Sequence, residues 1–179
     1  MSITKQKQQS SYLALAETFG YTSPMQSPRI EKVIVSSGVG KKRDKKQLEL
    51  IEDRLAKITG QKPAPRGAKT SIAAFKVREG DTVGLQITLR GARMYDFLDK
   101  LIHIALPRTR DFRGLSPKAI DDMGNITIGI REHTIFPETS DEDLKDVFGL
   151  AITIVTTAKS RAEAEAFFRH IGLPLIVIK

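Results

Sequence analysis

Hydrophobic residues recur along the chain with two different periods. In four segments they return every three to four positions, as in a helix that buries one face, and each segment ends close to a glycine or a proline. In four shorter segments, apolar residues follow one another or alternate with polar ones, which is typical of strands. We expect helices over residues 3–19, 44–59, 94–105 and 160–171, and strands over residues 30–35, 83–89, 126–130 and 150–154.

Two of the expected helices carry further signals. Leu13, Leu15 and Phe19 gather on one side of the first helix and are expected to face the core. At the last helix, Ser160 and Glu163 have the spacing of a capping box, in which each side chain bonds to the backbone N–H of the other residue. These signals predict the buried face of the first helix and the start of the last.

The alternation within the strands indicates the fold class. Strands of a parallel sheet that is covered on both faces are continuously apolar, whereas these strands carry Thr, Ser, Gln, Gly or Arg at alternate positions. We therefore expect an α/β chain of the α+β type: a two-layer sandwich in which helices cover one face of a mostly antiparallel sheet and leave a polar face open. No repeat or long linker interrupts the sequence, so residues 1–179 are expected to form one domain with a tail at 173–179.

Composition narrows the class of protein. The 179 residues include no cysteine, which excludes a disulfide scaffold, a thiolate zinc site and a cysteine nucleophile. The first residues lack the apolar stretch of a secretory signal, and no later run approaches the roughly 18–20 apolar residues of a membrane span. Lys and Arg number 29 against 21 Asp and Glu, a formal net charge of +8. We expect a soluble cytoplasmic protein without a membrane partner, and nucleic acid is the first candidate for an anionic partner.

The net charge is unevenly distributed along the chain. Residues 1–118 contain 23 basic and 11 acidic side chains, whereas residues 119–158 contain 2 basic and 8 acidic ones. One interpretation is that the folded protein presents two faces of opposite potential, and so has two partners of opposite charge. The alternative is that folding disperses the two blocks.

A glycine turn with lysines follows the first expected strand. Residues 36–42 resemble a phosphate-binding loop, but Val35 replaces its first glycine and Lys42 replaces the Ser or Thr whose hydroxyl must reach magnesium. Nucleotide hydrolysis is therefore not expected. Glycines that permit close approach, beside Lys41 and Lys42, instead suit the phosphate backbone of a nucleic acid. A solvated basic turn is the alternative.

Two further segments are basic. In residues 66–80, cationic side chains surround one aromatic residue and few neighbours are large enough to pack, which predicts a projecting loop. Phe75 in this loop either packs on an RNA base or sugar or folds back into the core. The second basic segment is bounded by prolines and glycines and contains Arg108, Arg110, Arg113 and Lys118. We expect its three arginines to be a further RNA contact.

Catalytic signals are scarce, and an acidic block remains. No histidine has a partner at metal-ligand spacing, and neither a nucleophile elbow nor a zinc-protease histidine pair is present. We expect no enzymatic activity, no metal and no cofactor. The acidic block either meets a basic protein or keeps a loop soluble. Its residues are Glu138, Asp141, Glu142, Asp143 and Asp146.

Nine motifs spread over the chain recur in one protein family. They are ITGQKP at 58–63, TLRG at 88–91, MYDFL at 94–98, LPR at 106–108, DFRGL at 111–115, GN at 124–125, GI at 129–130, IFPE at 135–138 and IVTTA at 154–158. In this order they resemble the bacterial large-subunit ribosomal protein "L five" family, which binds 5S ribosomal RNA in the central protuberance. The resemblance covers nearly the whole chain.

The resemblance implies a structural protein without catalysis, which binds 5S rRNA and large-subunit rRNA beside other 5S-binding ribosomal proteins. By position, the 5S contact falls on Ser36, Ser37, Gly38, Val39, Gly40, Lys41, Lys42, Gln61, Lys62, Thr88 and Arg90. A contact to the transfer RNA of the peptidyl site falls on Lys69, Thr70, Ser71, Phe75, Lys76 and Arg78. An inter-subunit bridge to a basic protein of the small-subunit head falls on the acidic block.

Overall fold

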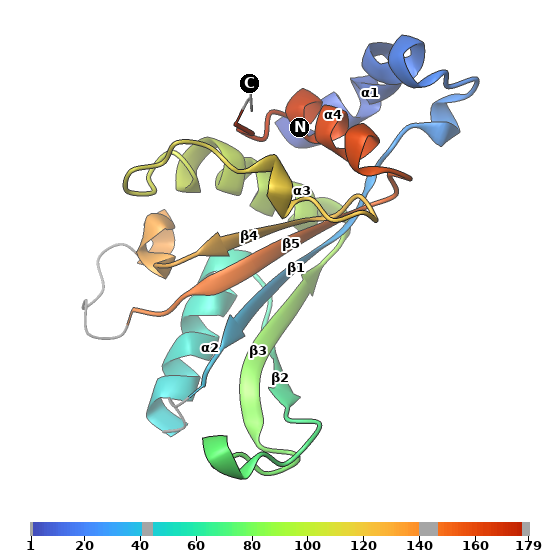
Figure 1. Cartoon of the computed structure of the whole chain (residues 1–179). Coiled ribbons are helices and arrows are strands. Elements are labelled where there is room, and N and C mark those ends of the chain that lie inside the picture. Colours follow the sequence, from blue (N-terminus) through green and yellow to red (C-terminus); the bar gives the residue numbers. More distant parts are fainter. Residues whose placement is uncertain (1, 41–44, 140–146, 177–179) are drawn as a thin grey trace. The chain divides into compact units, whose positions relative to one another are not determined.

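The structure is a computed structural model that describes residues 2–40, 45–139 and 147–176. The described part contains four α-helices and one antiparallel sheet of five strands in the order β2-β3-β1-β5-β4 (Figure 1). This is the α+β fold that the strand alternation predicted. The helices are α1 (Ile3–Phe19), α2 (Lys45–Thr59), α3 (Gly91–Lys100) and α4 (Arg161–Ile171), and the strands are β1 (Ile30–Gly38), β2 (Ala64–Gly67), β3 (Thr82–Leu89), β4 (Ile126–Ile130) and β5 (Leu150–Thr156).

The chain forms two compact units. Unit 1 contains Met1–Val33, Leu89–Ile128 and Thr153–Lys179, and unit 2 contains Ile34–Thr88 and Gly129–Ile152. β2 lies wholly in unit 2, whereas the other four strands of the described sheet pass from one unit into the other. The single domain expected for residues 1–179 stays a prediction.

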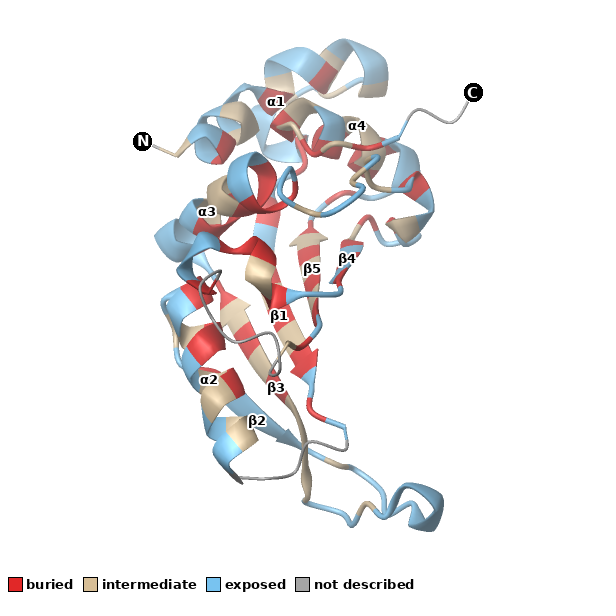
Figure 2. Ribbon diagram, turned by 90° about the vertical axis from the view of Figure 1, so that its left-hand side faces the viewer, coloured by how far each residue is buried: buried red, intermediate tan, exposed pale blue. Residues whose placement is uncertain are grey.

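In unit 2, one amphipathic helix covers the apolar side of the strands. Ile51, Leu55 and Ile58 of α2 lie three or four residues apart, so they share one face of the helix, and all three are buried. Leu85 and Ile87 of β3 are buried as well. The residues that alternate with them are only partly buried, so the second face of the strand is left open (Figure 2).

In unit 1, α1 packs against both α3 and α4. The carboxylate of Asp99 in α3 accepts the backbone N–H groups of Ile3 (3.0 Å) and Thr4 (2.8 Å), which have no partner within the first turn of α1. Burial acts to raise the pKa of Asp99, but hydrogen bonds from Ser2, Thr4 and Ile3 outweigh it and hold this pKa below its ordinary value. Asp99 therefore links the two helices as an anion at a helix N-terminus.

The expected buried face of α1 is wrong in one respect. Leu13 is 80% exposed, and the buried residues of this helix are Thr4, Ser11 and Leu15. Leu13 lies two residues after Ser11 and hence about 200° around the helix from it, so the face that carries Ser11 leaves Leu13 in solvent. Two of the three buried side chains are thus small and polar, and the hydroxyl of one of them, Ser11, is bonded to the Ser27 hydroxyl (2.7 Å).

The other two helix predictions hold in extent but differ in detail. The expected helix over 94–105 begins as α3 and continues as a π-helical turn over Leu101–Ala105, where Leu106 N–H donates to the carbonyl of Leu101 (2.9 Å). At α4, the Ser160 hydroxyl accepts the N–H of Glu163 as predicted. The Glu163 carboxylate instead accepts the N–H of Lys159 (2.6 Å), one residue before the expected partner.

Two short pairings were not anticipated. β2 adds to the sheet as an edge strand beside β3, a position that tolerates Pro65 because its outer side has no ladder partner. In the C-terminal tail, Leu173 and Leu175 are buried, and Leu175 forms a parallel bridge with Leu115. The described part of the tail is thus packed into unit 1.

Candidate nucleic-acid interface

The strand β1 extends to Gly38, so Ser36 and Ser37, which were expected in a turn, belong to the end of the strand and to the turn that it enters. The side chains here point alternately into and out of unit 2. The Ser37 hydroxyl donates to the carbonyl oxygen of Gly149 (2.8 Å), and the Val39 N–H donates to the carbonyl of Val83 (3.0 Å). Ser37 and Val39 are both buried, whereas Ser36 is partly exposed. A ligand at this turn therefore meets Ser36 and the backbone, rather than the side chains of Ser37 and Val39.

Glycines bring the backbones of β1 and β3 close together at this turn. A Cβ atom on Gly84 would lie 3.1 Å from the carbonyl oxygen of Ser37, closer than an ordinary van der Waals contact. Gly40 has a φ of 47°, in the left-handed region that glycine enters without steric cost. The predicted contacts Lys41 and Lys42, which come next in the chain, lie outside the described residues.

Gln61 and Lys62 follow the end of α2 and lie beside β3. The helix ends at Thr59 and is followed by Gly60, whose φ is 69°. The amide Nε2 of Gln61 donates to the carbonyl oxygen of Thr88 (3.4 Å), so two candidates that are far apart in sequence are brought together. The Lys62 ammonium lies 3.1 Å from a carboxylate oxygen of Glu52, and its side chain is 83% exposed. It remains accessible to a phosphate.

Sequence reasoning missed one polar pair on the open face of unit 2. Arg66 of β2 donates through Nε to the Oε1 oxygen of Gln86 on β3 (2.6 Å). Gln86 alternates with the buried Leu85 and Ile87, so it shares the open face with Thr88. The period of two in β3 puts Gln86 on the same face as Thr88, and that signal was present in the sequence.

Arg90 belongs to unit 1 and has a local partner. It directly precedes α3, and its guanidinium lies 3.5 Å from the carboxylate of Glu31. Lys32 lies 3.9 Å from the same carboxylate. The side chain of Arg90 is 58% exposed, so the ion pair partly offsets the charge of the guanidinium but leaves it accessible to solvent.

The segment over 66–80, which we expect to be a projecting loop, begins at a pair of glycines. Beyond β2 and before β3, the N–H of Ala68 donates to the carbonyl of Asp81 (2.8 Å), and that of Gly80 donates to the carbonyl of Ala68 (3.0 Å). A Cβ on Gly67 would lie 3.2 Å from the carbonyl oxygen of Gly80. The two chain segments thus approach more closely at the base of the loop than side chains would permit.

The tip of this loop is exposed along its length (Figure 2). A bridge between Ile72 and Val77 closes the tip, and Lys76 occupies the left-handed region with a φ of 52°. Phe75 is 72% exposed, so of the two alternatives for this residue the one in which it enters the core is wrong. Lys69, Thr70, Ser71, Lys76 and Arg78 are exposed as well.

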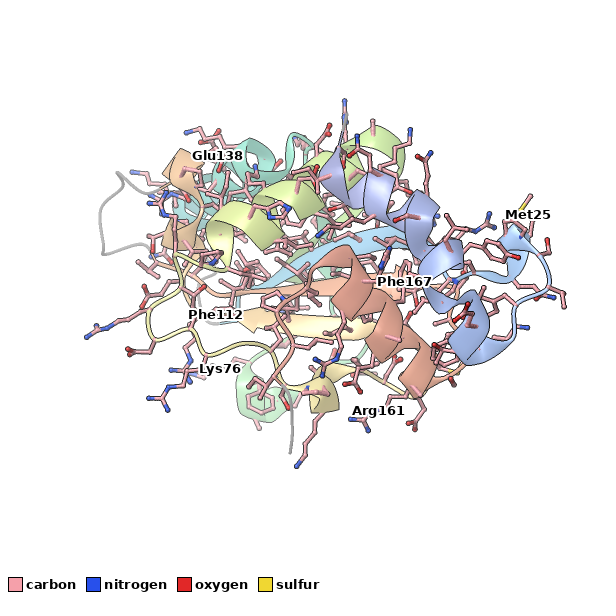
Figure 3. The ribbon with its side chains drawn as sticks, turned by 90° about the horizontal axis from the view of Figure 1, so that it is seen from above. Met25, Lys76, Phe112, Glu138, Arg161 and Phe167 are labelled. Carbon is pink, nitrogen blue, oxygen red and sulfur yellow. The ribbon has the colours of Figure 1, made fainter. Side chains whose placement is uncertain are left out.

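The arginine segment and the acidic block are only partly described. Arg108, Arg110 and Arg113 are exposed in unit 1 after the π-helical turn, and Arg110 forms only a long contact of 4.0 Å with Asp111. Glu138 is exposed in unit 2 (Figure 3). The other acidic residues, Asp141, Glu142, Asp143 and Asp146, lie outside the described residues.

Residues that precede and follow the acidic block in the sequence form a buried cluster. His133 stacks on Phe148 with ring centroids 4.2 Å apart, and its Nδ1 accepts the Phe148 N–H (3.4 Å). Its Nε2 lies 3.5 Å from Nη1 of Arg54, a buried arginine of α2. Neither His133 nor Arg54 was recognised from the sequence as a core residue, since both residue types are usually exposed or only partly buried.

The described part of the chain contains no group of three or more His, Cys, Asp or Glu side chains arranged to hold a metal ion. None of its helices has the length and apolar character needed to cross a membrane.

Comparison with known proteins places these observations in a family. Residues 23–78 match the family model described as "Ribosomal protein L5", and residues 82–175 match the model of the C-terminus of the same ribosomal family. The protein called "Large ribosomal subunit protein uL5" in Anaeromyxobacter sp. (strain K) is 48% identical over 161 residues, 89% of each chain. Those of Rubrobacter xylanophilus and Desulfatibacillum aliphaticivorans are 51% identical over 162 residues and 52% identical over 161 residues, with 89–90% of each chain covered. The chain therefore belongs to the ribosomal protein L5 family.

Proposed function

We infer that this chain is a structural constituent of the large ribosomal subunit in the cytoplasm, where it associates with ribosomal RNA. Its relatives are named as proteins of that subunit and are about half identical to it over nine-tenths of their length. Membership of this family makes it a structural protein and not an enzyme. The basic composition expected to favour an anionic partner accords with this role.

At finer detail, we propose that unit 2 binds 5S rRNA through the open face of its strands. The observation that carries this proposal is a strand face that α2 does not cover, where Ser36 of β1 and Thr88 of β3 alternate with buried residues. Gln61 is bonded to the Thr88 carbonyl beside this face, and Arg66 is bonded to Gln86 on it. Polar groups and a cation on an open strand face suit sugar and phosphate contacts, which position a protein on RNA. The glycine turn adds backbone N–H groups and, with Lys41 and Lys42, further charge.

We propose three further contacts from the exposed segments. The loop over 66–80 contacts the transfer RNA of the peptidyl site, since Phe75 offers an exposed aromatic face and Lys69 and Arg78 offer charge for the backbone. The acidic block that includes Glu138 contacts a basic protein of the small-subunit head. Arg108, Arg110 and Arg113 contact large-subunit rRNA, and other 5S-binding ribosomal proteins lie nearby.

The 5S proposal is tested by measuring binding of the full chain to 5S rRNA across a range of salt concentrations. The double variant Lys62→Ala, Arg66→Ala removes two cations from this surface. We expect the slope of log affinity against log salt to fall by about one for each phosphate that is no longer neutralised. The matched control, Lys57→Ala, Arg169→Ala, removes two cations that are ion-paired with Asp53 and Glu165 at 2.7 and 2.8 Å. Equal slopes for the two doubles would place the 5S site elsewhere.

A further inference from the structure

A second group of cations gathers in unit 1, and none of its members is among the residues assigned above to RNA. Lys159 precedes α4, and Arg161 is the first residue of this helix. Lys118 lies in the 3₁₀ turn η4 (Pro117–Ala119). Arg29 directly precedes β1. All four residues are exposed. They come from three separate stretches of the sequence, so no single sequence motif predicts the cluster.

Backbone and side-chain hydrogen bonds bring these stretches together. The Arg29 N–H donates to the Thr157 hydroxyl (3.0 Å), and the Thr157 N–H donates to the Arg29 carbonyl (3.0 Å). Lys159 follows two residues later. The Arg161 guanidinium donates through Nη2 to the carbonyl of Pro117 (2.9 Å), the residue before Lys118. Figure 3 shows Arg161 at the start of α4.

The buried carboxylate of Glu163 holds the middle of this cluster in place. One oxygen accepts the Lys159 N–H (2.6 Å), and the other accepts the Tyr21 hydroxyl. Burial, followed by the hydrogen bond to Glu163 and the charge of this carboxylate, raises the pKa of Tyr21 well above its ordinary value, so Tyr21 remains a donor. Glu163 is a positioning residue, because it fixes the backbone from which Lys159 and Arg161 project.

The four cations lack acidic partners in the part of the chain that the structure describes. No ion pair there involves Arg29, Lys118, Lys159 or Arg161, in contrast to Arg169 on the same helix, which pairs with Glu165. Two carboxylates lie in the turn after η4. Both are exposed, and Asp121 accepts the backbone N–H (2.7 Å) and the side-chain N–H (3.0 Å) of Asn125. The cluster therefore keeps an excess of positive charge.

We propose that Arg29, Lys118, Lys159 and Arg161 form a second RNA-binding surface, which takes the phosphate backbone of a helical RNA segment without reading its sequence. Exposed Lys and Arg side chains suit phosphates rather than stacked bases, and the aromatic residue of this region, Tyr21, is held through its hydroxyl by Glu163. An acidic protein segment is the competing occupant. RNA is favoured because this inference rests on the proposed placement of the chain among ribosomal RNA, although it does not depend on which residues bind 5S rRNA.

The test measures binding of the full chain to a short RNA duplex of unrelated sequence by fluorescence anisotropy at several salt concentrations. The variant Lys118→Ala, Lys159→Ala is compared with the control Lys57→Ala, Arg169→Ala, which removes the same charge from ion-paired positions. We expect the cluster variant to lower the salt slope by about two and the affinity at 0.1 M salt by about tenfold per cation, because each phosphate that is no longer neutralised removes about one unit of slope. The control keeps the original slope.

A third variant acts in the opposite direction. Asp122→Asn removes a repulsive charge near the cluster and is expected to tighten duplex binding about twofold at low salt. Equal slopes for the cluster and control doubles, in proteins with unchanged melting temperatures, would overturn the proposal and leave the acidic protein segment as occupant. Failure of the 5S surface is distinguishable, since it appears as unchanged 5S binding by Lys62→Ala, Arg66→Ala and leaves the duplex result intact.

Discussion

Replacement of Glu163 tests whether one buried carboxylate joins the region after α1 to the start of α4. Glu163 is 5% exposed, and its two oxygens accept from the Lys159 N–H (2.6 Å) and from the Tyr21 hydroxyl. In Glu163→Ala both bonds disappear and the Lys159 N–H is left without its acceptor. In Glu163→Gln both hydrogen bonds persist in neutral form, since the amide oxygen accepts from Lys159 and the amide nitrogen donates to the Tyr21 oxygen.

The two variants are expected to differ in free energy of unfolding. A hydrogen bond to a charged group contributes about 1.5–3 kcal/mol, and a buried donor left without a partner costs about 1–3 kcal/mol. Since Tyr21 is partly exposed and can bond to water instead, we expect Glu163→Ala to lose about 3 kcal/mol and Glu163→Gln about 1–1.5 kcal/mol. For a chain of this size, 3 kcal/mol corresponds to a melting temperature lower by about 6–12 °C.

The assay is urea and thermal unfolding at neutral pH, with Glu165→Ala as control. Glu165 lies on the same helix, but its ion pair with Arg169 is partly exposed and is expected to contribute at most about 0.5 kcal/mol. A double-mutant cycle with Tyr21→Phe and Glu163→Ala should give a coupling energy of about 1 kcal/mol. Equal losses for Glu163→Ala and Glu165→Ala, or a coupling energy near zero, would refute the reasoning.

Three further predictions concern single side chains. The pKa of Tyr21 is raised in the folded state. Its contribution to the free energy of unfolding is therefore complete below about pH 10, where the unfolded tyrosine ionises, and is lost as pH rises above that value. In urea titrations, the difference in free energy of unfolding between the natural chain and Tyr21→Phe should narrow at alkaline pH. The pKa of Asp99 is lowered, so its contribution is present above about pH 4 and is lost as pH falls through the folded-state value. Asp99→Asn should therefore cost about 0.5–2 kcal/mol at pH 7, and a cost that persists undiminished at pH 2 would contradict this account. Ser37→Ala removes a buried donor to Gly149 and should cost about 1–2 kcal/mol in unfolding experiments, yet leave 5S rRNA affinity unchanged; weaker RNA binding by the folded variant would show that the hydroxyl is used by RNA.

The local pattern of the sequence was sufficient for the four helices, for four of the five strands in the described sheet and for the fold class. Helical spacing in α2 and strict alternation in β3 report which side of each element is apolar, and that is a property of neighbouring residues alone. The exposure of residues in the 66–80 segment was also predictable, because this segment offers little apolar area to bury and its cations favour water. The family motifs also predicted the protein family to which the chain belongs.

Only the tertiary structure decided which side chains the candidate sites present. The sequence put Ser36 and Ser37 together in one turn, but pairing with the neighbouring strands buries Ser37 and leaves Ser36 accessible. Sequence also assigned Lys118 to the arginine segment, whereas the bond from Arg161 to Pro117 sets it beside the start of α4. Composition and periodicity record what each residue prefers, but hydrogen bonds between residues far apart in the chain determine which charges become neighbours, and the RNA surfaces proposed here depend on those neighbours.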